Sequence, residues 1–345
     1  MRAPFILLAA WLGLVPMLLP QRLAPTKITL KATVPGELLV SRPAWIDAAM
    51  CDERGNVYTR PTEKAIAGGV EYFRAPIQEI TPAVKADRSF QVTSALPDGA
   101  ESRTFFVHDN RVYVLAGAHP AGLYVVQLEQ DGSVKSRTKL DLTSFADIFH
   151  LAVFESGEYL LVGLTGKHSR IPFTAVFGAD GRLVRKIYEP EDQEAYERAE
   201  MGDPKYAPCC ANSGNTFVME NSDVAAGSDG NLYLLHGGSS PLVYVISHSG
   251  DVLRKFRIDP GDSGLTASRI RFFEGRLAVS FDWPGDIPRT LVKVLDMKGN
   301  LIENYEIEEG INDSDPILAC YNSGGFTLVP RQMDTKFHLV MARIP

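Results

Sequence analysis

The sequence has no run of basic residues longer than two, as in Arg185-Lys186, and its formal net charge is −7. Binding to nucleic acid phosphates requires a basic face, so nucleic acid is excluded as a partner. The chain also contains no G-x-S-x-G, H-E-x-x-H or C-x-x-C motif. A serine hydrolase with a nucleophile elbow, a zincin and a cysteine-ligated zinc site are therefore not predicted.

Long apolar runs are missing except at the start, where Arg2 precedes an apolar stretch from Phe5 to Leu19. A short basic start followed by such a stretch indicates a secretory signal, and the stretch is shorter than the roughly 20 residues of a membrane span. No clear cleavage site follows, so an uncleaved membrane anchor is the alternative and a buried helix the third interpretation. Residues 1–25 are predicted to be a signal peptide or anchor, with residues 26–345 folded outside the cytoplasm, in the periplasm or secreted. Membrane contact is expected only through this segment.

Short β-rich runs repeat along the chain in the manner of a β-propeller. The clearest unit spans residues 222–259, where four such runs alternate with turns that include Asp229-Gly230 and Ser249-Gly250. These dipeptides are hairpin signals, because glycine adopts the positive φ that tight turns need. Four antiparallel strands joined by hairpins form one propeller blade.

The turn between the third and fourth strands recurs at a regular interval. Its glycines, Gly132, Gly181, Gly250 and Gly299, are 49, 69 and 49 residues apart. The longer interval indicates an insertion, which we place at residues 190–215. The turn between the first and second strands recurs at residues 54–56, 109–111, 156–158, 229–231, 274–276 and 323–325. These turns predict six blades.

The two ends of the chain complement each other. The last unit has only three predicted strands, the third over Phe337–Ala342, while Lys27–Val34 supplies a spare strand at the front. Pairing the two would close the ring and remove an open sheet edge. We predict an all-β fold, a six-bladed β-propeller of four-stranded antiparallel blades closed by the N-terminal strand. The segment Pro61–Pro76 of the first blade is predicted to be a loop.

The blade containing Ser228-Asp229-Gly230-Asn231-Leu232-Tyr233, then Val243-Tyr244-Val245-Ile246, resembles an NHL-type blade. Residues 292–301 share part of this pattern. The resemblance implies the NHL or gluconolactonase-like six-bladed fold and implies little about activity, because one fold hosts many functions.

A set of oxygen-bearing side chains lies near the starts of predicted inner strands: Asp147, Asn221, Asp223 and Asp315. Oxygen ligands converging on a channel mouth suit Ca²⁺. The segment Asn221-Ser222-Asp223 is similar to one in the gluconolactonase family, whose members use a divalent metal to hydrolyse lactones, but the Glu-Gly-Pro segment of that family is absent. The alternative is that these acids cap turns. No other cofactor is predicted.

Cationic, imidazole and aromatic side chains fall in the predicted loops between second and third strands. Those singled out as ligand-binding candidates are His119, His168, Arg170, His236, Trp283, Arg289 and Arg331. Such a rim suits a carboxylate or sugar acid, and histidine there suits a general base. The alternative is a solvated rim of mixed charge.

Residues 191–201, within the insertion, have the composition of a short exposed helix. They precede the adjacent Cys209 and Cys210, which can pair with each other or elsewhere, and the insertion is predicted to be a lid, a partner contact or a tolerated excursion. Cys51 and Cys320 each lie four residues before a turn glycine, at equivalent inner-strand positions of the first and last blades. They are predicted to be either bridged or two buried thiols.

No strong catalytic motif is present, so the predicted function is an extracytoplasmic scaffold that binds a protein or small-molecule ligand. A metal-dependent lactonase of gluconolactonase type is the alternative.

Overall fold

The computed structural model describes residues 27–33, 37–39, 44–62, 66–67, 70–71, 76–83, 86–90, 101–118, 122–142, 147–165, 171–187, 223–262, 264–282, 290–308, 316–333 and 336–345. The predicted N-terminal segment 1–25 and insertion 190–215, with its helix, lie outside these residues. Across the described ranges, no helix is long and apolar enough to cross a membrane.

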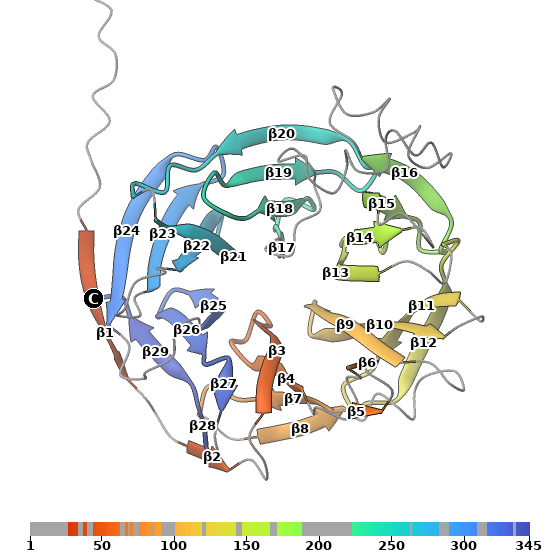
Figure 1. The fold of residues 1–345 in the computed structure, drawn as a ribbon, viewed down its shortest axis with the longest axis horizontal. Coiled ribbons are helices and arrows are strands. Elements are labelled where there is room, and N and C mark those ends of the chain that lie inside the picture. Colours follow the sequence, from red (N-terminus) through yellow and green to blue (C-terminus); the bar gives the residue numbers. More distant parts are fainter. Residues whose placement is uncertain are drawn as a thin grey trace, which may run out of the picture.

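Antiparallel sheets are arranged around a central axis (Figure 1). Three four-stranded sheets follow one another in the chain. The first contains β9 (Glu101–His108), β10 (Arg111–Ala118), β11 (Gly122–Leu128) and β12 (Val134–Lys139). The second contains β13 (Asp147–Val153), β14 (Tyr159–Thr165), β15 (Ile171–Phe177) and β16 (Leu183–Ile187). The third contains β17 (Asp223–Ala226), β18 (Leu232–His236), β19 (Leu242–Ile246) and β20 (Val252–Arg257).

Two larger sheets complete the arrangement. A five-stranded sheet has the order β27-β3-β4-β7-β8, with β27 at Gln332–Met333, β3 at Ala44–Cys51, β4 at Val57–Thr62, β7 at Ile77–Ile80 and β8 at Ala86–Phe90. An eight-stranded sheet has the order β21-β22-β23-β24-β1-β29-β26-β25. Its strands are β1 (Lys27–Thr33), β21 (Thr266–Phe273), β22 (Arg276–Asp282), β23 (Thr290–Asp296), β24 (Leu301–Glu308), β25 (Ile317–Asn322), β26 (Gly325–Val329) and β29 (Val340–Arg343). The predicted all-β propeller with four-stranded antiparallel blades is confirmed.

The N-terminal strand β1 joins two parts of the eight-stranded sheet. It pairs antiparallel with β29, where Ala32 lies opposite Ala342, as the sequence predicts. It also pairs parallel with β24 over Lys27–Lys31. The prediction did not include this second pairing, because a parallel neighbour brought together by the ring leaves no hairpin signal in the sequence.

Burial is highest in the middle strands of a blade and lowest in the outermost strand. Every residue of β18 is buried, whereas the outer strand β20 alternates between exposed and half-buried positions. Inner and middle strands have neighbouring sheets on both faces, and such strands have nearly continuous apolar sequences. The core therefore lies between the sheets, and the innermost strands bring their ends together near the axis.

The segment Pro61–Pro76, predicted to be a loop, contains strands in the structure. Strand β4 continues to Thr62, and β5 (Ile66–Ala67) pairs with β6 (Val70–Glu71). Two glycines separate β5 from β6 in the sequence, and a Gly-Gly pair between apolar residues is a hairpin signal that our interpretation overlooked.

The structure also differs from the prediction at the final strand Phe337–Ala342, which is divided into two strands. The strand β28 (Lys336–His338) pairs with β2 (Glu37–Leu39), whereas β29 pairs with β26. Leu339 separates the two strands, and the partner of β28 lies near the start of the chain, where no local pattern indicates the pairing.

Candidate functional site

A cavity of about 600 Å³ lies where the innermost strands end. The ends of β3, β9, β17, β21 and β25, and the turns after the innermost strands, form its lining. Its apolar wall includes Met50, Phe106, Val224, Phe272, Phe273 and Tyr321. Successive antiparallel strands reverse direction, so these turns lie at the opposite end of the blades from the loops between second and third strands, where the sequence placed the site.

Acidic residues recur at one position of the turn that follows each innermost strand. The first residue of this turn is Glu53, Asp109, Glu155, Ser228, Glu274 or Ser323, and all except Ser323 line the cavity. Four of these six side chains are carboxylates. Asp109 pairs with Arg111 at 3.1 Å. Within the described residues, no ion pair involves the other three carboxylates, so we define Glu53, Glu155 and Glu274 as the acidic rim.

The backbone at this rim is unusual. Among the described residues, the only ones other than glycine with positive φ are Asp109, Asn110 and Glu274. Asparagine and aspartate tolerate this conformation, whereas a glutamate with a φ of 45° is strained. Strain of this kind is concentrated at functional sites. The conformation of Glu274 is therefore a second indication, independent of charge, that this end of the channel is used.

His108 lies inside the rim, and its Nε2 is buried without a hydrogen-bond partner in the described part of the chain. Burial lowers the pKa of His108, although the nearby carboxylates of Glu53, Asp109 and Glu155 act in the opposite direction. The imidazole is thus neutral at neutral pH. A neutral imidazole beside these carboxylates leaves the mouth of the cavity with a net negative charge.

The pH dependence of stability is expected to report on His108. Its pKa in the folded protein lies below the value of about 6.5 for an unfolded chain. The protonation of His108 therefore costs the folded protein nothing above this unfolded value. The free energy of unfolding falls as the pH is lowered from that value through the folded pKa. Urea unfolding between pH 7.5 and pH 5 should show a larger loss of stability for the unaltered protein than for His108→Gln. Identical pH profiles of the two proteins would contradict this assignment.

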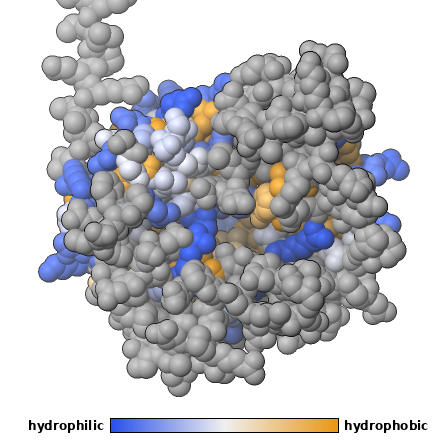
Figure 2. Space-filling model, viewed as in Figure 1, coloured by the Kyte–Doolittle hydropathy of each residue, from blue (hydrophilic) through white to orange (hydrophobic). Residues whose placement is uncertain are grey.

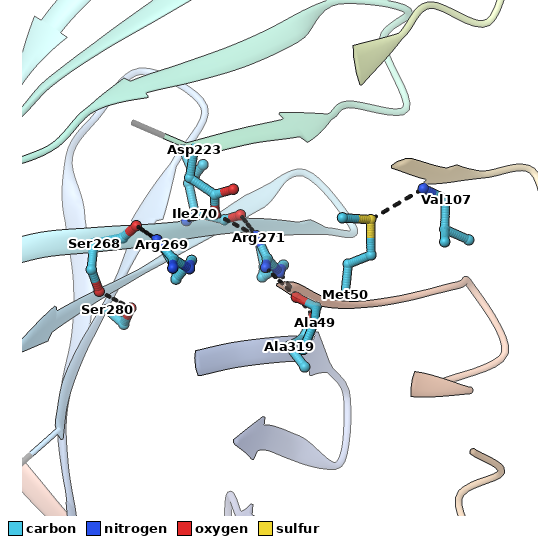
Figure 3. Close-up of polar contacts among 10 residues, drawn as sticks. All are labelled: Ala49, Met50, Val107, Asp223, Ser268, Arg269, Ile270, Arg271, Ser280 and Ala319. Carbon is cyan, nitrogen blue, oxygen red and sulfur yellow. Dashed lines mark hydrogen bonds and ion pairs between the residues drawn. The ribbon is translucent and has the colours of Figure 1, made fainter. Parts of the chain in front are cut away.

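Arg271 lines the cavity and connects four inner strands, which are its own strand β21 and the strands β3, β17 and β25 (Figure 3). Its guanidinium donates to the carbonyl oxygen of Ala319 on β25 at 2.8 Å and to that of Ala49 on β3 at 2.9 Å. It also donates to Asp223 Oδ2 on β17 at 2.6 Å. A buried charge is tolerated only when its donors are satisfied, and here the satisfying groups come from strands far apart in the sequence.

Asp223, a predicted metal ligand, is therefore held by an arginine. Its Oδ2 also accepts a hydrogen bond from the backbone N–H of Ile270 at 2.9 Å. Burial alone would raise the pKa of Asp223, but the guanidinium groups of Arg271 and Arg269 outweigh burial and the pKa lies below its ordinary value. The carboxylate therefore stays ionised in a structural ion pair with Arg271.

Two predicted ligand-binding residues are described, and they occupy different environments. His236 ends β18 and is buried, with 6 % of its surface exposed. Arg331 is half-buried, and its carbonyl oxygen accepts a hydrogen bond from Ile46 N at 2.8 Å. Its charge also contributes to a lowered pKa of Arg269, for which burial is the main cause. On the face shown in Figure 2, hydrophilic and hydrophobic residues both reach the surface near the centre.

The other predicted site residues lie outside the described part of the chain: His119, His168, Arg170, Asn221, Trp283, Arg289 and Asp315. Asp147 begins β13, but its side chain is not described. Within the described residues, no group of three or more His, Cys, Asp or Glu side chains is placed to hold a metal ion. The Ca²⁺ site stays a prediction, and the cavity does not depend on it.

The sequence carried signals for the rim that our interpretation did not use. Asp109 and Glu274 are the first residues of turns that the sequence predicts, while Glu53 and Glu155 immediately precede two others. Arg271 has a weaker signal, as one of two arginines in the innermost strand Thr266–Phe273. Nothing local indicates that it reaches β3, because Ala49 lies 222 residues away.

No family model matches the sequence, and no curated protein matches it. Solved structures do match. A luciferin-regenerating enzyme is 10 % identical, with a TM-score of 0.51 and coverage of 90 % of this chain and 95 % of that one. The PQQ-bound aldose sugar dehydrogenase of Streptomyces coelicolor is 11 % identical, with a TM-score of 0.45 and coverage of 92 % and 99 %. The WD40 domain of Neurospora crassa Pan2 is 8 % identical, with a TM-score of 0.47 and coverage of 93 % and 98 %.

Identities this low show the fold alone, since one fold hosts many functions. The luciferin-regenerating enzyme, together with the radial four-stranded sheets, places this chain among the β-propellers.

Proposed function

We propose that this protein is a six-bladed β-propeller that acts outside the cytoplasm as a binding scaffold, and that its cavity binds a cationic and partly apolar segment of a protein partner. Six turns between first and second strands support the blade number, as does the NHL-like pattern. The eight-stranded sheet is what two blades would form if their outer strands met at β1. The proposed location rests on the apolar N-terminal stretch from Phe5 to Leu19.

The proposed ligand is inferred from the residues that line the cavity. A volume of about 600 Å³ falls within the usual range for ligand pockets, which is roughly 300–1,000 Å³. Aromatic faces such as those of Phe272 and Tyr321 attract cations, and so do ionised carboxylates at the rim. Arg271 does not offset this charge freely, because it is bound to Asp223 and to carbonyl oxygens.

A lysine or arginine side chain beside an apolar residue matches this combination. Its charge would lie among the carboxylates of the acidic rim, and its apolar neighbour would contact the aromatic wall. Complementary charge raises the rate of encounter and makes binding sensitive to salt. The strained backbone at Glu274 is explained in the same way, since a carboxylate is kept at a turn position where glycine or asparagine would be less strained.

Neutralising the acidic rim is expected to weaken binding without unfolding the protein. Random seven-residue peptides displayed on phage would be selected on the unaltered chain, and the best peptide measured by calorimetry. We expect lysine or arginine next to apolar residues in the selected peptides. The triple variant Glu53→Gln, Glu155→Gln, Glu274→Asn should bind the best peptide about ten-fold more weakly, since three exposed charge contacts contribute together about 1–2 kcal/mol.

The single variant Glu274→Asn is the matched control for protein damage. Asparagine tolerates positive φ better than glutamate, so this variant should unfold at the same or a higher urea concentration while binding the peptide less well. Selected peptides without a bias toward basic residues, or equal affinity for the triple variant, would rule out the proposed ligand. Loss of binding that accompanies loss of stability would contradict the role of Glu274.

A further inference from the structure

Two thiols from opposite ends of the chain lie together beneath the cavity. Cys51 is the last residue of β3, is half-buried and lines the cavity. Cys320 is on β25 and has 0 % of its surface exposed. Cys51 packs against the apolar cluster that contains Cys320, and both are free thiols. The sequence left open whether these cysteines are bridged or free, and in the structure they are free.

Arg271 holds the two strands that carry these thiols. Its hydrogen bonds end on Ala319, the neighbour of Cys320, and on Ala49, two residues before Cys51. One guanidinium thus bridges β3 and β25 next to the sulfur atoms. A disulfide needs two Cα atoms within about 7 Å and correctly directed Cβ atoms. A side chain that fixes the separation of the strands at this point prepares such a geometry.

We propose that Cys51 and Cys320 form a redox-active dithiol, in which the cavity admits a small disulfide oxidant to Cys51 and Cys320 completes the bond between β3 and β25. This inference goes beyond the proposed ligand and does not depend on it. It assigns a modification site to the base of the cavity.

The reaction proceeds by two thiol–disulfide exchanges. The thiolate of Cys51 attacks one sulfur of the oxidant, forming a mixed disulfide and releasing the first oxidant thiolate. The thiolate of Cys320 then attacks the sulfur of Cys51 and releases the second. Two protein thiols lose two electrons and two protons, and the oxidant disulfide becomes two thiols.

The environments of the two cysteines set this order. Cys51 is open to the cavity, so the oxidant reaches it first. Burial raises the pKa of the Cys320 thiol, and its hydrogen bond with Cys51 acts in the same direction, while the charge of Arg271 opposes both. A buried thiol with a raised pKa is inert toward reagents in solution. It reacts only when an activated sulfur is brought beside it, which is the role of a resolving cysteine.

Oxidation with glutathione disulfide tests the proposal. The chain carrying Cys209→Ser and Cys210→Ser, which removes the other two thiols, would be incubated with this reagent and digested without reduction. We expect a linked pair of peptides containing Cys51 and Cys320, and a melting temperature higher by about 5 °C that returns on reduction. The same linked peptides should appear in the unaltered chain, which covers the case of a poorly folding variant.

Two further variants separate the roles of the thiols. With Cys320→Ser, the mixed disulfide on Cys51 should accumulate, because no resolving thiol is present. With Cys51→Ser, Cys320 should stay unmodified. A stable mixed disulfide on Cys51 in the presence of Cys320, or no reaction at either thiol, would overturn the proposal. The rim variants should still form this disulfide normally when they lose peptide binding. The two proposals can therefore fail independently of each other.

Discussion

Replacing Arg271 with methionine is expected to lower the free energy of unfolding by about 3–5 kcal/mol. Methionine keeps much of the side-chain volume but removes every donor. The carboxylate of Asp223 is then a buried charge without its counter-ion, and the carbonyl oxygens of Ala49 and Ala319 lose their shared donor. Urea unfolding followed by tryptophan fluorescence and by circular dichroism would measure the change.

A double-mutant cycle separates the ion pair from the other contacts of Arg271. The variant Asp223→Asn removes one charge, and combining it with Arg271→Met should recover part of the loss, since no buried charge is left unpaired. The variant Arg271→Lys should recover little, because a single ammonium cannot reproduce the planar arrangement of guanidinium donors. A loss of less than 1 kcal/mol for Arg271→Met would show that the strands do not depend on this side chain.

Replacing Gly181 with alanine is expected to be the second large effect, at about 3 kcal/mol. Gly181 is in the turn between β15 and β16 and has a φ of +82°. An added Cβ would overlap the carbonyl oxygen of Lys139, at the end of β12 in the neighbouring sheet. The same turn accepts a hydrogen bond from Asp141 N at 2.8 Å, so the two sheets cannot separate without losing it.

Gly132 is the matched control for this substitution. It occupies the corresponding turn between β11 and β12 with the same φ of +82°, but the nearest atom to an added Cβ is on Phe90 at 3.8 Å. Gly132→Ala should therefore cost only the backbone strain, about 1 kcal/mol. Equal losses for Gly132→Ala and Gly181→Ala, measured by urea unfolding, would refute a specific role for the contact between sheets.

Much of the fold could be predicted because its signals are local. Gly181 and Gly132 mark turns whose backbone requires positive φ, and the alternating runs beside them indicate strands. The division of the strand near Leu339 could not be predicted. The partner β26 is close in the sequence, but β2 lies near the start of the chain, and neither pairing changes the alternation of apolar side chains.

Less of the candidate site than of the fold could be predicted from the sequence. The carboxylates of Glu53, Glu155 and Glu274 occupy one position in the turns of the structure, but the turns predicted from sequence begin one residue later in two of the three cases. Asp223 showed the opposite difficulty. Its neighbours in sequence suggested a metal ligand, while the group that binds it, Arg271, lies 48 residues further along.

The sequence by itself determined the repeated hairpins and their period, because a turn's conformation depends on the few residues within it. Tertiary structure decided which end of the channel has the cavity, and what Arg271 and the pair Cys51 and Cys320 contact. These groups meet near the axis because innermost strands from separate sheets converge there. Such contacts join residues as far apart as Ala49 and Arg271, and no local pattern in the chain encodes them.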